Sequence, residues 1–89
     1  MTIKEFVRDI VMKENRGLKR CYIAIMPMDG QFDLEVETVA SETIGGTYRT
    51  DTSNLEMARK LANQMHRELN RRGVKVFRSR VRWESLVKA

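Results

Sequence analysis

The sequence predicts an α+β fold in which two helices cover one face of a mainly antiparallel sheet of three or four strands. Three observations lead to this prediction. Two segments with apolar residues at helical spacing begin with capping-box motifs, an alternating segment between them contains the hairpin dipeptide Asp29-Gly30, and a strand-like segment follows the second helix. The expected order is α-β-β-(β)-α-β, with the weakest signal in the bracketed strand, and residues 1–89 are expected to form one domain.

The first helix is expected to begin after Thr2 and to run to about Glu14. Thr2 and Glu5 have the spacing of a capping box, in which each side chain accepts a hydrogen bond from the other residue's backbone N–H. Apolar residues follow at helical spacing, namely Ile3, Phe6, Val7 and Ile10. Gly17 is expected to end this segment, because glycine adopts left-handed backbone angles without a steric cost.

The dipeptide Asp29-Gly30 predicts the pairing of a hairpin within residues 18–40. If these two residues form the loop, Ile25 faces Leu34, and a shift of one residue would mix isoleucine with glutamate on both faces. One face then carries Cys21, Ile23, Ile25, Phe32, Leu34 and Val36. The opposite face carries Tyr22, Ala24, Met26, Asp33, Glu35 and Glu37.

The segments after the hairpin predict a third strand and a second helix. Residues 41–50 favour a strand, in which Gly45-Gly46 marks a bulge or a corner. Ser53-Asn54-Leu55-Glu56 is a second capping box, and Gly73 is the expected end of the helix that it opens. The apolar stripe of this helix consists of Leu55, Ala58, Leu61, Ala62, Met65 and Leu69.

Two further features constrain the sheet. Pro27 has no N–H to donate, so it requires a sheet edge or a bulge. The last expected strand, residues 74–83, alternates two sets of side chains. One set is Phe77, Val81 and Trp83, and the other is Arg78, Arg80 and Arg82. With both helices on one face, the other face is expected to be open and to carry the arginine row as well as the acidic row of the hairpin.

The positive charge is concentrated in the C-terminal part of the chain. The net charge is +5 overall, +7 for residues 53–89 and −2 for residues 1–52. This asymmetry is typical of a protein that binds a polyanion. It also fits a basic element that pairs with the acidic half of its own chain. The sequence leaves both interpretations open.

The arginine row is the sharpest functional signal. Alternate residues of a strand lie about 6.6 Å apart, which is close to the spacing of successive phosphates. We therefore expect a non-enzymatic accessory protein that binds nucleic acid through its C-terminal strand and second helix. The expected contacts are Arg59, Lys60, Arg67, Arg71, Arg72, Lys75, Arg78, Arg80 and Arg82. The competing interpretation is cross-strand pairing with the acidic row, which requires only that the two strands be neighbours.

An alternative function is a protein-interaction or inhibitor module, for instance a homodimer, that uses the open sheet face. Exposed methionines beside an aromatic ring make an adaptable contact surface. The expected partner-binding residues are Tyr22, Met26, Met28, Asp33, Glu35 and Glu37. The same carboxylates have the chemistry of a general acid and base, but nothing in the sequence supplies a pocket around them.

The sequence contains no pattern typical of a metal centre or a nucleophilic active site, so no cofactor or catalytic residue is expected. His66 is the only histidine, and Cys21 is the only cysteine and has the parity of a core residue. Lys4 and Arg8 stand where a secretory signal would have its apolar segment, and no apolar run approaches about 18 residues. We expect a cytoplasmic protein that has no membrane partner.

The order of helix, strands and helix is similar to that of the double-stranded-RNA-binding domain. That family has a basic cluster at the start of its second helix, where this chain has Ser53-Asn54-Leu55-Glu56. The family also does not require the strand that follows the second helix here. The resemblance is confined to element order and implies no site residue in this chain.

Overall fold

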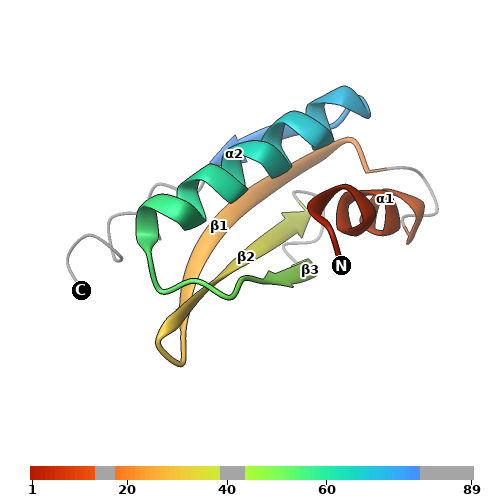
Figure 1. Cartoon of the computed structure of the whole chain (residues 1–89). Coiled ribbons are helices and arrows are strands. Elements are labelled where there is room, and N and C mark those ends of the chain that lie inside the picture. The colour runs from red at the N-terminus through yellow and green to blue at the C-terminus, as the bar shows by residue number, and fades with distance from the viewer. Residues whose placement is uncertain (14–17, 39–43, 79–89) are drawn as a thin grey trace.

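The fold is α+β, with two helices and a four-stranded mixed sheet that is mostly antiparallel (Figure 1). The computed structural model describes residues 1–13, 18–38 and 44–78. Its elements are α1 (Ile3–Lys13), β1 (Arg20–Met28), β2 (Gln31–Thr38), β3 (Ile44–Arg49), α2 (Leu55–Arg71) and β4 (Lys75–Arg78). The expected element order is thereby confirmed, including the third strand. The predictions for Gly17, Arg80, Arg82 and Trp83 fall outside the described residues.

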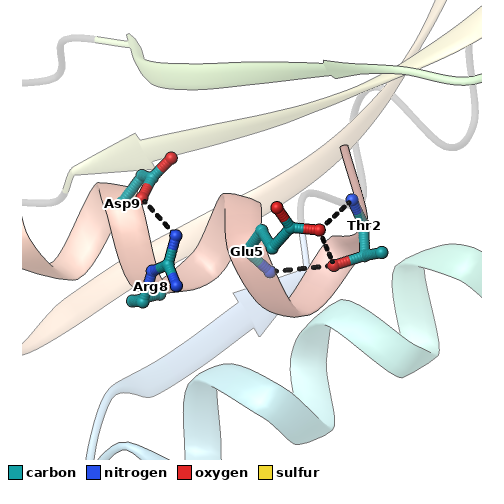
Figure 2. Close-up of polar contacts among 4 residues, drawn as sticks. All are labelled: Thr2, Glu5, Arg8 and Asp9. Carbon is teal, nitrogen blue, oxygen red and sulfur yellow. Dashed lines mark hydrogen bonds and ion pairs between the residues drawn. The ribbon is translucent and has the colours of Figure 1, made fainter.

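Helix α1 begins with the predicted capping box (Figure 2). The Glu5 backbone N–H donates to Thr2 Oγ1 at 3.1 Å, and the Thr2 N–H lies 3.3 Å from Glu5 Oε1. The Thr2 hydroxyl donates to Glu5 Oε1 at 2.9 Å, and this bond, followed by the bond from the Thr2 backbone N–H, lowers the pKa of the Glu5 carboxyl. The buried residues of α1 are the four of the predicted stripe, Ile3, Phe6, Val7 and Ile10. Figure 2 also shows the exposed Arg8–Asp9 ion pair on this helix.

The β1–β2 hairpin has the predicted register. Ile25 pairs with Leu34 and Ile23 with Val36, and all four side chains are fully buried. Asp29 and Gly30 both have positive φ, at 49° and 79°, which is the conformation that a two-residue hairpin loop requires.

Strand β3 pairs with β2 and carries the predicted bulge. The register shifts between Val36 and Glu37, opposite Gly46 and Ile44. Gly46 lies against α1, where an added Cβ would stand 2.9 Å from Ile10 Cδ1 and 3.1 Å from Phe6 Cζ. The absence of a side chain therefore lets α1 pack closely on this strand.

Helix α2 begins one residue later than the second capping box predicted. The N-cap is Asn54, whose side-chain oxygen accepts from the backbone N–H groups of Glu56 at 2.9 Å and Met57 at 3.2 Å. Asparagine is as good an N-cap as serine, so either residue satisfies these donors. The helix ends as predicted at Gly73, which has a φ of 84° and donates to the Asn70 carbonyl.

The strand order in the sheet is β3-β2-β1-β4, and β4 runs parallel to β1. The described pairing with β4 covers Arg20 to Ile23 and stops there. Pro27 pairs with Phe32 of β2 and lies beyond the part of β1 that pairs with the described residues of β4.

Both helices lie on one side of the sheet, and α2 runs along β1 (Figure 1). The core between helices and sheet contains the predicted residues of α1, the hairpin and α2. On α2 the fully buried residues are Ala58, Ala62, Met65 and Leu69, whereas Leu55 and Leu61 are half-buried. The sheet therefore has a helix-covered face and a second face that points away from both helices.

Candidate nucleic-acid interface

The acidic strand and the basic strand are not neighbours in the described sheet. β2 carries Asp33, Glu35 and Glu37, and β1 lies between it and β4. Two strand spacings separate β2 from β4, or about 9.5 Å. The described part of β4, Lys75–Arg78, is therefore not the direct cross-strand neighbour of the acidic row that the competing interpretation requires.

Strand alternation had predicted that Arg78 lies on the second face. In the structure it lies on the helix-covered face. In the parallel register it stands beside Ile23, a core residue. Its guanidinium donates to the Ala62 carbonyl at 3.1 Å and to Asn63 Oδ1 at 2.9 Å. Burial lowers the pKa of Arg78. The prediction failed because parity within one strand does not say which of the two sets faces the helices. Arg78 attaches β4 to α2.

A cluster of five cations lies where β1 begins, α2 ends and β4 begins; we call it the basic corner. Its members are Lys19, Arg20, Arg71, Arg72 and Lys75, all of which are exposed. The backbone brings them together: the Lys75 N–H donates to the Lys19 carbonyl at 2.8 Å, and Arg20 pairs with Lys75 in the register. Gly73 turns the chain from α2 into β4 within two residues of Arg71 and Lys75.

One acidic side chain moderates the basic corner. Glu68 Oε2 lies 3.8 Å from Arg71 and Glu68 Oε1 lies 3.7 Å from Arg72. Both pairs are on the protein surface, where such interactions are weak and screened by salt. In the part of the chain that the structure describes, the five cations of the corner outnumber the one carboxylate that forms ion pairs with them.

The outer side of α2 extends this positive surface. Arg59, Lys60 and Arg67 are exposed and lie away from the buried stripe of the helix. Lys60 and Arg67 are seven residues apart, so they stand about 10.5 Å apart along the helix axis. Arg67 is four residues from Arg71, one turn of the helix from the basic corner.

The second face carries an aromatic pair next to the basic corner. Tyr22 of β1 and Phe77 of β4 are neighbours in the register, and their ring centroids are 5.4 Å apart with an interplanar angle of 40°. The two residues are 39% and 36% exposed. Lys75 Nζ lies 5.7 Å from the centre of the Phe77 ring. An aromatic surface and a positive charge therefore adjoin one another on this face.

The remaining residues of the second face are less exposed than the sequence predicted. Ala24 is fully buried and Asp33 is 4% exposed. Both are short side chains that stand beside longer ones, Ala24 beside Tyr22 and Met26 and Asp33 beside Met26 and Arg49. Among the six predicted partner-binding residues, Tyr22 and Met28 are exposed, and Met26, Glu35 and Glu37 are half-buried.

Cys21 and His66 carry a reactive thiol and imidazole, and both lie outside this interface. Cys21 is fully buried, and desolvation raises the pKa of its thiol to about 11. His66 is half-buried, and its pKa is lowered by desolvation and then by the charge of Arg78. In the residues that the structure describes, no group of three or more His, Cys, Asp or Glu side chains is placed to hold a metal ion.

Three residues of the interface were missed by the sequence analysis. Lys19 and Arg20 lie in the first half of the chain, and only the parallel pairing of β1 with β4 brings them to Lys75. Phe77 was assigned to the core side by its alternation with the arginines. The one signal in the sequence was the Lys75-x-Phe77 spacing, which puts both residues on one face of a strand.

Comparison of this chain with protein-family models, with curated proteins and with solved structures finds no match. Within the described residues, no helix is long and apolar enough to cross a membrane.

Proposed function

We propose that this protein is a non-enzymatic accessory protein that binds nucleic acid through the basic corner and the outer side of α2. The observation that carries the proposal is the convergence of five exposed cations from three elements at one corner. Cations gathered from separate elements form a compact positive surface of the kind that contacts phosphates.

The strand order supports the same proposal. Phosphates at the basic corner would contact Arg20 of β1 and Lys75 of β4, and β2 with its carboxylates is the next strand on the other side of β1. The cations of α2 extend the surface from the corner along the helix.

The test is the salt dependence of binding. Fluorescence anisotropy with labelled duplex and single-stranded oligonucleotides should detect binding at about 50 mM salt, with an affinity that falls steeply towards 200 mM. Lys75→Gln should weaken binding and reduce the log–log slope by about 0.7 on single strands or 0.9 on duplex DNA, the value for one phosphate contact. Absence of salt-sensitive binding to either probe would refute the proposed function.

The alternative function, a protein-interaction module or homodimer, is favoured by the exposed apolar side chains of the second face. Tyr22, Phe77 and Met28 are each more than one third exposed. If two copies associate through this face, light scattering should show a mass that doubles with concentration, and Phe77→Ser should restore the monomer. A monomer at every concentration, together with salt-sensitive oligonucleotide binding, would favour the nucleic-acid interface.

A further inference from the structure

We infer that the nucleic acid is single-stranded and that one of its bases stacks on the Tyr22–Phe77 pair. This inference deepens the proposed function and depends on it. Two register pairs lie side by side on the second face, Arg20 with Lys75 and Tyr22 with Phe77. One is a pair of cations, and the other is a pair of aromatic rings.

The spacing of the two pairs matches the two parts of a nucleotide. Residues i and i+2 of a strand point to the same face about 6.6 Å apart, so each aromatic ring has a cation as its next neighbour on the same strand. A nucleotide likewise carries a charged phosphate one sugar away from its flat base. Arg20 and Lys75 are placed for the phosphate, and the two rings for the base.

The aromatic pair has the exposure that stacking needs. More than a third of each residue is accessible, and the rings are tilted at 40° to each other. Base stacking on aromatic side chains tolerates any base, because every base has a π-face. Lys75 Nζ lies over the Phe77 ring, 5.7 Å from its centroid, and adds a positive charge to the platform that the two rings form.

The Tyr22–Phe77 platform is expected to favour single strands over a duplex. Bases in a double helix are stacked on each other and expose only their edges in the grooves, so rings on a sheet surface cannot stack on them. Unpaired bases have free faces. Strand β2, which carries Glu35 and Glu37, borders the platform on its other side.

The most direct test leaves the protein unchanged and removes the bases from the probe. Anisotropy titrations at one salt concentration would compare an oligothymidylate with an abasic oligonucleotide of the same length and phosphate number. Stacking predicts that the oligothymidylate binds roughly 5- to 150-fold more tightly, which corresponds to the 1–3 kcal/mol of a stacked base. The salt slopes of the two probes should agree, since their phosphates are the same.

Substitutions at Tyr22 and Phe77 test the role of the two rings. Tyr22→Leu with Phe77→Leu keeps apolar bulk on the sheet and removes both rings, so it should abolish the preference for oligothymidylate over the abasic probe. Tyr22→Phe should keep the preference. Met12→Ala, which changes an exposed apolar residue of α1 that is 75% accessible, is the matched control and should have no effect. Circular dichroism melts would verify that each variant folds.

The outcomes separate this inference from the proposed function. Equal affinity of the wild-type protein for the two single-stranded probes would overturn stacking and leave phosphate binding intact. A duplex bound as tightly as the oligothymidylate would also overturn the single-strand preference. Failure of all three probes to bind at low salt would refute both.

Discussion

Strands β2 and β4 carry opposite charges and have opposite positions in the sheet. β2 lies between β3 and β1, and its carboxylates have neighbours on both sides. β4 lies at the edge of the described sheet, beside β1, and it sends Lys75 and Phe77 to one face and Arg78 to the other. The acidic strand is thus part of the sheet interior, whereas the basic strand has an accessible surface.

This difference shows how position decides what a charged strand can do. A row of carboxylates inside the sheet has the cations and dipoles of adjacent strands as close neighbours, such as Arg49 opposite Asp33. At an edge, a strand has only one neighbour, so half of its surroundings are solvent, a helix or a ligand. The function proposed above uses the edge, and stability depends more on the interior.

The largest expected effect is a loss of stability when a core-facing residue of each strand is truncated. Leu34→Ala on β2 removes a fully buried side chain and should lower the free energy of unfolding by about 2–5 kcal/mol, measured by urea titration. Val76→Ala on β4 changes a half-buried residue and should cost about 1 kcal/mol. Equal losses at the two sites would contradict the distinction between interior and edge.

A smaller effect is expected from the two faces of β4. Arg78→Met keeps the length of the side chain but loses the hydrogen bonds to Ala62 and Asn63, so unfolding free energy should fall by about 1–2 kcal/mol. Lys75→Met, on the exposed face, should change stability by less than about 0.5 kcal/mol. If Lys75→Met were the more destabilising, the assignment of Arg78 to the helix-covered face would be wrong.

The smallest effect is a pH dependence at the α2–β4 contact. The pKa of His66 is lower in the folded protein than its usual value of 6.5, so the unfolded chain takes up the proton first as the pH falls. The contribution of neutral His66 is therefore complete above about pH 6.5 and decreases as the pH falls through the folded pKa. Thermal melts between pH 5 and 7 should show a gentler acid-side loss for His66→Gln than for the wild-type protein. Parallel curves for the two proteins would contradict this assignment.

Local sequence patterns predicted the elements and most of the core. Asp29-Gly30 determined which residues of the hairpin face each other, and the Thr2–Glu5 pair and Gly73 marked helix ends through hydrogen bonds within a few residues. These features depend on nearby residues alone. They are therefore present in the sequence itself.

The candidate site was predicted only in part, because it depends on pairing between distant segments. Lys75, Arg71 and Arg72 were recognised as basic, but Lys19 and Arg20 joined them only through the parallel β1–β4 ladder. Alternation in the last strand correctly placed Phe77 and Arg78 on opposite faces. Which set faces the helices is decided by the position of β4 beside β1 and under α2, and the sequence contains no local signal for that position.

The most direct test of the central claim compares the basic corner with a matched pair of cations elsewhere. Arg20→Gln with Lys75→Gln removes two positive charges from the corner, and Lys4→Gln with Lys13→Gln removes two exposed charges from α1. In anisotropy titrations with an oligothymidylate from 50 to 200 mM salt, the corner variant should bind more weakly and lose about 1.4 from the log–log slope, while the α1 variant should match the wild-type protein. Equal losses in the two variants would contradict the account, because they would show that net charge, and not this corner, holds the nucleic acid.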